Sequence, residues 1–160
     1  MKISALLILI VTGLMVGCND QADLDDQGTH FELNTIKDGT AYQSALEALD
    51  EGTKSDLFKI NSVVIDDNTL KLLINVSYGG GCKKHVFDLI WPDAIIAIYP
   101  PQFGLILNHN ANEDMCEAYL TQTLEIDLKN NPLNLDDQSI KDMTVTVING
   151  SNPDEKVQSE

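Results

Sequence analysis

Alternation of apolar and polar residues is the dominant pattern of this chain from about residue 60 onward. Between Leu70 and Tyr78 every second residue is apolar, which is typical of a β-strand with one buried face. Seven segments carry such alternation or short apolar runs: 60–65, 70–78, 84–91, 94–99, 103–107, 120–128 and 143–148. Turn-forming residues such as Asp66-Asp67-Asn68 separate them. We therefore expect mainly β structure, as a single antiparallel β-sandwich of immunoglobulin-like architecture with at most one short helix.

Outside these strands the polar and apolar positions follow other patterns. Residues 40–50 place Tyr42, Leu46 and Leu49 on one face, which predicts the one short helix. Residues 18–35 are polar and acidic with little periodicity, and residues 151–160 carry no apolar pattern. We therefore expect a flexible tether over 18–35, a folded domain over 36–150 and a disordered tail over 151–160.

The N-terminal segment has a different character. Residues 3–16 form an apolar run that is too short for a bilayer span, which needs roughly 20 residues, so it is typical of a signal-peptide core. Gly17 directly precedes Cys18. These residues resemble the lipobox of bacterial lipoproteins, with Met15 where Leu is commonest. The resemblance implies removal of residues 1–17, acylation of Cys18 and, since Asn19 rather than Asp follows the cysteine, an outer-membrane location facing the periplasm.

Charge restricts the partners of the domain. The chain has a net charge of −15, and all ten of its basic residues are Lys. So acidic a chain gains nothing from counterion release on nucleic acid, which excludes that class of partner. An anionic membrane surface repels it as well, so we expect the lipid on Cys18 to hold the protein at the membrane. The remaining partners are a second envelope protein or a small ligand.

Cys82 and Cys116 are the two cysteines that remain after Cys18 is assigned to lipid. In an oxidising compartment such a pair most often forms a disulfide. A bond between them brings two polar segments together. Four residues able to carry chemistry then share one neighbourhood: His85, His109, Asp114 and Glu117.

The sequence around the two cysteines resembles a second, more specific pattern. Gly79-Gly80-Gly81-Cys82 is followed by His85 and Phe87, and later in the chain Asp114 precedes Cys116-Glu117-Ala118. These segments resemble a group of uncharacterised bacterial envelope lipoproteins, over residues 60–128. The resemblance supports the disulfide and the sandwich and implies no activity.

Metal binding is the alternative use of the same residues. Cys82, His85, His109 and Cys116 form a legitimate tetrahedral set for zinc or copper, and His85, His109 and Asp114 could act without the sulfurs. Asn110, Asn112 and Asp114 have the spacing of the front of a calcium loop, which supports weak calcium binding only. The loop then departs from that pattern, because Met115 replaces the turn glycine and Thr121 stands where the bidentate Glu belongs.

Catalytic constellations are missing from the sequence, so we predict no catalytic residue and no cofactor. No serine lies in a Gly-x-Ser-x-Gly elbow, and the adjacent acidic pairs occur in turns. Trp91 and Phe87 alternate with Leu89, which is typical of core residues rather than a ligand groove. The sequence thus favours a non-enzymatic, lipid-anchored envelope protein that is structural or binds a protein or ligand.

Overall fold

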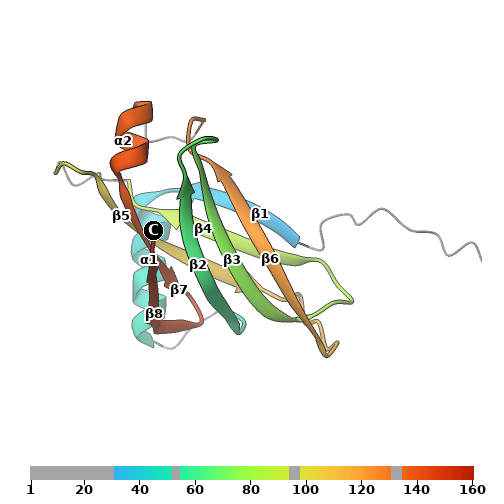
Figure 1. The fold of residues 1–160 in the computed structure, drawn as a ribbon. Helices are drawn as coiled ribbons and strands as arrows, with labels where there is room; N and C mark the ends of the chain where they lie inside the picture. Colours follow the sequence, from blue (N-terminus) through green and yellow to red (C-terminus); the bar gives the residue numbers. More distant parts are fainter. Residues whose placement is uncertain (1–30, 52–54, 94–97, 131–134) are drawn as a thin grey trace, which may run out of the picture.

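The computed structural model describes residues 31–51, 55–93, 98–130 and 135–160, and within them the chain forms eight strands and two helices (Figure 1). The elements are β1 (Phe31–Lys37), α1 (Gly39–Glu51), β2 (Phe58–Asp66), β3 (Lys71–Gly80), β4 (His85–Trp91), β5 (Gln102–Asn110), β6 (Ala118–Asp127), α2 (Asp137–Asp142), β7 (Thr144–Asn149) and β8 (Asn152–Gln158). The predicted signal peptide, Cys18, most of the tether and residues 94–97 of one predicted run lie outside the described residues. The mainly β fold class is confirmed.

Two sheets make up the domain. One has five strands in the order β1-β4-β5-β7-β8, and the other has three in the order β2-β3-β6. The chain leaves the five-stranded sheet after β1, forms β2 and β3, and returns as β4; it leaves again after β5 to form β6. Each sheet is therefore built from segments far apart in the sequence, and several loops run from one sheet to the other.

The expectation of purely antiparallel sheets is wrong for the five-stranded sheet. β1 runs parallel to β4, and β5 runs parallel to β7. Parallel neighbours need long connections, and the excursions into the three-stranded sheet supply them. A reading of successive short strands as hairpins misses this, because the pattern within a strand does not reveal its partner.

The strand faces predicted by alternation are confirmed. Leu72, Ile74, Val76 and Tyr78 of β3 are at most 1% exposed. On β4 the inward side chains include His85, Phe87, Leu89 and Trp91, all at most 1% exposed. Side chains of both sheets belong to one hydrophobic cluster, so apolar burial between the two sheets is the main source of stability.

Helix α1 confirms the helix predicted over 40–50, and it covers part of the outer face of the five-stranded sheet. Ala45 packs there against Ile90 and Ile106, which point away from the shared core. The Asp38 carboxylate caps the helix by accepting hydrogen bonds from the backbone N–H of Thr40 (2.8 Å) and Ala41 (3.0 Å). Neither described helix is long and apolar enough to cross a membrane.

The limit of one helix is wrong, because the six-residue α2 is a second one. The Asp136 side chain accepts a hydrogen bond from the backbone N–H of Ser139 at 2.9 Å and caps it. Its single fully buried residue is Ile140. One apolar position in six residues is too few for a helical period to be recognised.

Both predicted chain-end segments also need correction. The tether expected to extend to residue 35 ends earlier, because β1 begins at Phe31 and pairs with β4. The tail expected over 151–160 is not disordered: Asn152–Gln158 forms β8, antiparallel to β7. Strand β8 lies at the sheet edge, where Pro153 is tolerated, and its pairing uses the backbone, so few apolar side chains mark it.

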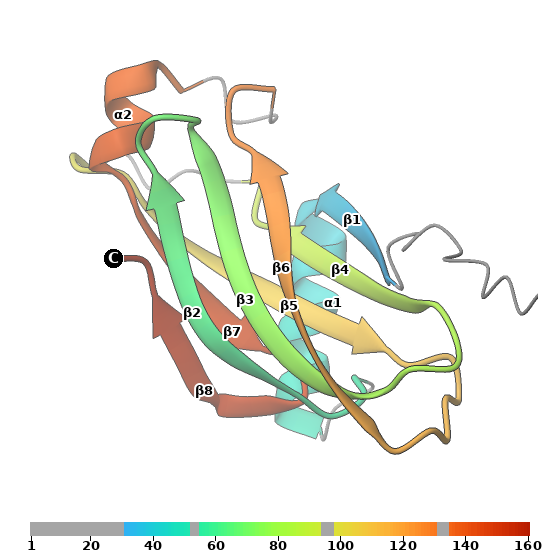
Figure 2. The same ribbon diagram turned by 45° about the vertical axis from the view of Figure 1, so that its right-hand side comes forward.

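Two loops meet at one end of the molecule. Figure 2 shows the β3–β4 loop and the β5–β6 loop side by side there. Each of them runs between the three-stranded and the five-stranded sheet. This end carries the cysteines, both core histidines and Asp114.

Candidate functional site

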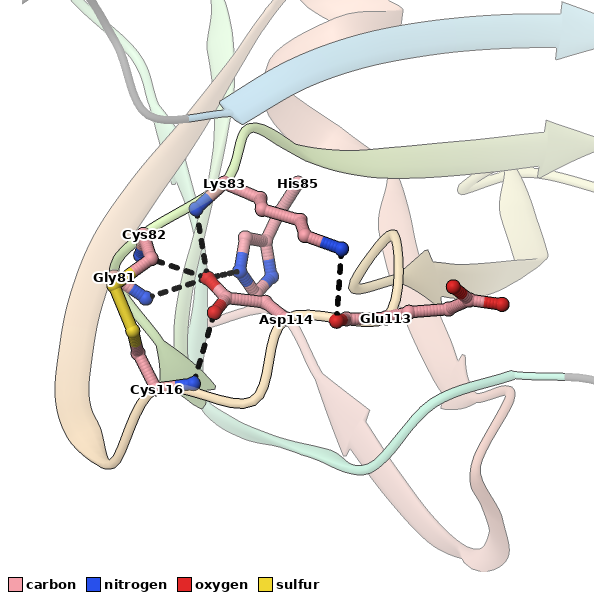
Figure 3. The surroundings of a disulfide bond; sticks show 7 residues. All are labelled: Gly81, Cys82, Lys83, His85, Glu113, Asp114 and Cys116. Carbon is pink, nitrogen blue, oxygen red and sulfur yellow. Dashed lines mark hydrogen bonds and ion pairs between the residues drawn. A yellow bond between two sulfur atoms is a disulfide. The ribbon is translucent and has the colours of Figure 1, made fainter.

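The two loops are joined covalently. Cys82 and Cys116 form a disulfide with their Cα atoms 5.9 Å apart, across a sequence separation of 34 residues (Figure 3). The pairing predicted from the sequence is thus present in the structure. Glu117, which was expected in the same neighbourhood, follows Cys116 and is exposed.

Asp114 lies beside the disulfide and organises both loops. Its Oδ2 accepts hydrogen bonds from the backbone N–H groups of Gly81 (2.8 Å), Cys82 (2.8 Å) and Lys83 (2.9 Å). Its Oδ1 accepts from the backbone N–H of Cys116 at 3.0 Å. These donors, with Cys116 contributing most, hold the pKa of the carboxyl well below its usual range. Asp114 is therefore an ionised anchor whose oxygens are already occupied.

The glycines before Cys82 allow this close approach. Gly80 and Gly81 have φ values of +141° and +118°, which side-chain-bearing residues rarely adopt. A Cβ on Gly80 would collide with the His85 ring and would lie 2.9 Å from Asp114 Oδ2. Gly80 is thus a steric requirement of the buried polar cluster, and Gly81 is required by its backbone conformation.

His85 and His109 extend the cluster into the core as a linear chain. His85 Nε2 lies 3.2 Å from Asp114 Oδ2, and His85 Nδ1 lies 2.8 Å from His109 Nε2. The ionised carboxylate can only accept, so His85 Nε2 carries a hydrogen. Between the two rings one nitrogen donates and the other accepts, so the tautomer of one ring fixes that of the other.

His109 is deeply embedded. It is 2% exposed and stacks on Phe87, with ring centroids 4.5 Å apart. Its Nδ1 makes no hydrogen bond. Burial, followed by the charge of His85, lowers the pKa of His109 from 6.5 to about 4. The ring is therefore neutral at pH 7 and behaves largely as part of the aromatic core.

The predicted metal sets do not converge on one point among the described residues. Sγ of Cys82, Sγ of Cys116 and a carboxylate oxygen of Asp114 lie within 4.8 Å of one another, yet the sulfurs are bonded together and offer no thiolate. The histidine nitrogens lie in line with Asp114 instead of surrounding a common centre.

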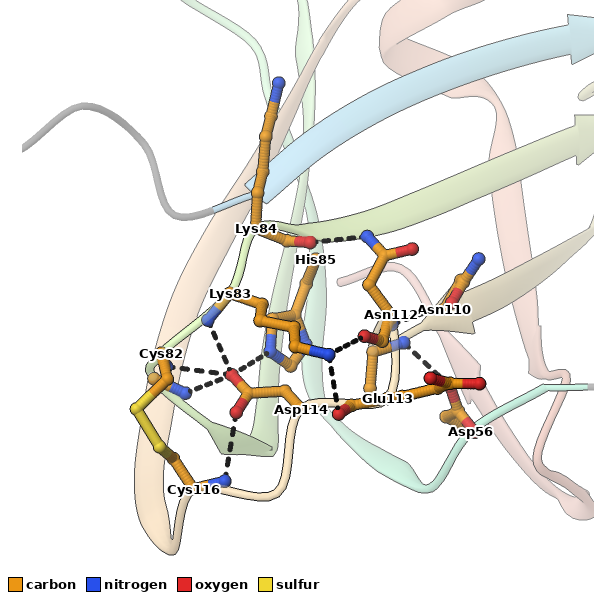
Figure 4. Close-up of polar contacts among 12 residues, drawn as sticks. Asp56, Cys82, Lys83, Lys84, His85, Asn110, Asn112, Glu113, Asp114 and Cys116 are labelled. Atoms are coloured by element: carbon orange, nitrogen blue, oxygen red, sulfur yellow. Dashed lines mark hydrogen bonds and ion pairs between the residues drawn. A yellow bond between two sulfur atoms is a disulfide. The ribbon is translucent and has the colours of Figure 1, made fainter.

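The expected calcium ligands serve the turn instead (Figure 4). Asn110 Oδ1 accepts from the backbone N–H of Asn112 at 2.8 Å, and Asn112 Nδ2 donates to the Lys84 carbonyl at 2.6 Å. Lys83 Nζ donates to the carbonyls of Asn112 (2.8 Å) and Glu113 (3.0 Å). These bonds stabilise the positive φ values of Asn112 (+53°) and Glu113 (+56°).

A hollow of about 420 Å³ lies against these loops. Its lining includes Asp56, Leu57, Gly79, Glu113 and Met115, together with His109 and Asp114. Two of its apolar side chains are strongly exposed, Leu57 at 82% and Met115 at 89%. Sequence reasoning missed this feature. The available signal was an apolar residue, Leu57, immediately before the inward-facing Phe58 and hence on the outward side.

Comparisons with known proteins give no family for this chain. No protein-family model matches the chain, and no curated protein matches it. Four solved structures do. One is a protein of unknown function, DUF1344, from Bacteroides vulgatus, with 14% identity, a TM-score of 0.44, and coverage of 80% of this chain and 54% of that one. Another is a "Putative TOXIN related protein" from Parabacteroides distasonis, with 22% identity, a TM-score of 0.45, and coverage of 80% and 58%. The chain thus spans little more than half the length of either protein.

Proposed function

We propose that this protein is a lipid-anchored component of the bacterial cell envelope whose β domain binds another envelope protein and performs no catalysis. The short apolar run, Gly17 and Cys18 support the anchor. Two or more acyl chains hold a protein stably at a membrane. The outer membrane, with the domain facing the periplasm, is the proposed location.

The binding role rests on the hollow at the disulfide end. Leu57 and Met115 are large apolar side chains left almost fully in water beside a concave surface, and such a combination is typical of an interaction site. The loops around it are tied by a disulfide and by the Asp114 hydrogen bonds. A surface held in one conformation pays little ordering entropy when it binds.

The polar cluster supports binding over catalysis. Both oxygens of Asp114 already accept backbone hydrogen bonds, and the depressed pKa of this carboxyl opposes uptake of a substrate proton. His85 is fully buried, and His109, although it lines the hollow, is only 2% exposed, so the two rings offer almost no surface to a reacting group. We also propose that the two sheets form a single β-sandwich, which is supported by the cluster of buried side chains drawn from both.

The anchor is tested by replacing its acylated residue. In cells, Cys18→Ala should release the protein from the membrane fraction and abolish incorporation of labelled palmitate, while Ser4→Ala, in the same signal segment, should change neither. Membrane retention of the Cys18→Ala protein at the wild-type level contradicts the anchor.

The binding role is tested by photo-crosslinking in cells. p-Benzoylphenylalanine at position 57 or 115 should give a discrete adduct of higher mass, whereas the same group at the exposed turn residue Asp67 should give none. If neither rim position gives an adduct, the hollow does not bind a protein partner.

Metal binding is the second candidate, and one observation favours it. His109 Nδ1 is a buried nitrogen with no hydrogen-bond partner, and reduction would free two thiolates near Asp114. Zinc or copper should then raise the melting temperature of the wild type, in either redox state, and not that of His85→Ala. If neither zinc nor copper changes the melting temperature of the wild type, and the purified protein retains no metal, this function is contradicted.

A further inference from the structure

The strand register builds an apolar row on the outer face of the three-stranded sheet. Phe58 pairs with Tyr78, and both point into the core. Gly79 pairs with Tyr119 on the neighbouring strand. Because successive residues point to opposite faces, Leu57, Gly79 and Tyr119 lie on the outward side, and Tyr119 is 71% exposed.

Gly79 leaves a gap in the middle of this row. A Cβ built on Gly79 has no atom within 4 Å, so the space above it is open. Gly79 also lines the hollow, together with Leu57 and Met115. The exposed side chains of Leu57 and Met115 therefore stand beside this open space, and Tyr119 lies next to Gly79 on the neighbouring strand. We call this set, with Gly79, the apolar clamp.

Acidic side chains border the same hollow. Asp56 and Glu113 line it, and neither forms an ion pair with any residue that the structure describes. Figure 4 shows the Glu113 side chain directed away from the disulfide, toward the side where Asp56 lies. The nearby ammonium group of Lys83 is bound to backbone carbonyls. Asp56 Oδ2 accepts a hydrogen bond from the backbone N–H of Ala111 at 2.7 Å, which leaves Asp56 Oδ1 and the Glu113 carboxylate to face a partner.

We propose that the hollow receives a basic, apolar segment of a partner polypeptide. A large apolar side chain would lie over Gly79 within the apolar clamp, and a neighbouring Lys or Arg would face Asp56 and Glu113. This inference rests on the proposed binding role and names the chemistry of the partner. A second copy of this acidic chain would oppose carboxylates to carboxylates, and an anionic lipid surface would be repelled, so charge favours the basic segment.

The experiment measures fluorescence anisotropy of labelled peptides titrated with the full lipidated protein in detergent. The probes are a peptide of alternating Lys and Leu, a Lys–Ser peptide of equal charge and a Glu–Leu peptide of equal apolarity. We expect the Lys–Leu peptide to bind about tenfold or more tightly than either of the others, since both the clamp and the rim are needed. Equal binding of the Lys–Leu and Lys–Ser peptides would overturn the proposal, as would preferential binding of the Glu–Leu peptide.

Two variants test the clamp. Gly79→Leu fills the open space and should weaken binding of the Lys–Leu peptide about tenfold or more. Leu57→Ser alters only a side chain that is 82% exposed, so it should fold normally and also weaken binding. Thermal melts check the fold of both. Wild-type affinity in the folded Leu57→Ser protein contradicts the clamp.

A charge reversal tests the rim against a matched control. Glu113→Lys should weaken binding of the Lys–Leu peptide and strengthen binding of the Glu–Leu peptide. Asp67→Lys makes the same change in net charge at the turn on the opposite end of β3, and should leave both affinities unchanged. Equal effects of the two reversals would mean that net charge alone attracts the peptide, which overturns the site. Crosslinking at positions 57 and 115 without Lys–Leu binding would leave the binding role intact and refute only the partner chemistry.

Discussion

The two ends of the three-stranded sheet are both organised by an aspartate, but over very different distances in the sequence. At the β2–β3 turn, Asp66 accepts hydrogen bonds from the backbone N–H of Asn68 (2.9 Å) and from the Thr69 hydroxyl (2.7 Å). At the other end, Asp114 accepts from Gly81, Cys82 and Lys83, which lie 31 to 33 residues earlier. The first aspartate shapes a turn, and the second connects two loops.

The difference matters because the turn connects strands of one sheet, whereas the two loops connect strands of different sheets. Strands β2 and β3 are neighbours in one sheet, so their turn joins two strands of the same sheet. The loops held by Asp114 each run between the two sheets. The disulfide end therefore couples the sheets to one another, and we expect changes there to destabilise the whole domain, whereas changes at the turn stay local.

Loss of the disulfide should have the largest effect. Replacing both Cys82 and Cys116 by Ser opens a loop of 34 residues, which costs about 3–4 kcal/mol in the chain-entropy model. Urea unfolding of the variant and the wild type measures the difference. The reduced wild type should match the double variant, and a loss below about 1 kcal/mol would show that the loops do not depend on the bond.

Acidification should have the next largest effect, through His109. Its pKa is about 4 in the folded state against 6.5 for the free side chain, so the unfolded state takes up a proton first as the pH falls. The free energy of unfolding should therefore decrease from about pH 6.5 to about pH 4, with His109 contributing about 3 kcal/mol of that loss. Unfolding curves across this range test it. In His109→Gln the slope should largely disappear, and an unchanged slope would assign the titration to another group.

Removing the charge of Asp114 should follow in size. Asp114→Asn replaces an acceptor by a group that is half donor, which leaves some of the four N–H groups poorly paired, and should lower the melting temperature by about 6 °C at pH 7. The pH dependence of the Asp114 contribution has the same sign as that of His109 but lies at lower pH. Because the folded pKa is depressed, the contribution is complete above the ordinary value of 3.8 and is lost as the pH falls below it. The variant should lack this acid-side loss; a melting temperature equal to the wild type's at pH 7 would contradict the anchoring role.

The matched substitution at the β2–β3 turn should have the smallest effect on stability. Asp66→Asn alters an exposed turn whose partners are two and three residues away, so the melting temperature should fall by only about 1 °C. The same thermal melts provide the measurement. If Asp66→Asn lowered the melting temperature as much as Asp114→Asn does, the two ends of the sheet would contribute equally to stability and the comparison would fail.

The strands of the core could be predicted from the sequence, whereas the edges could not. In β3 and β4 the apolar period is complete, because those strands bury one face against the other sheet. Strand β8 contains Pro153, Asp154, Glu155 and Lys156 and offers almost no such period. Its place depends on backbone pairing with β7, and on Glu155 and Val157, two isolated side chains that make no period of their own.

The sequence predicted which residues gather at the candidate site, but not what each of them does there. Cysteine pairing brought His85, His109 and Asp114 together, and the structure confirms that neighbourhood. Their roles were not visible, because metal-ligand spacing and a linear hydrogen-bond chain use the same residue types. Parity with Phe58 places Leu57 on the outward side, but nothing in the strand pattern brings Met115 of a distant loop beside it, so the hollow could not be predicted.

The parallel pairing of β1 with β4 has a consequence for the order of events during synthesis. Asn34 meets Asp88, its partner across the two strands, 54 residues later in the chain. At ribosomal rates of roughly 5–20 residues per second, β1 leaves the ribosome about 3–10 s before its neighbour exists. During that interval its backbone donors and acceptors are open to any other extended chain, so the earliest described strand stays unpaired until β4 arrives.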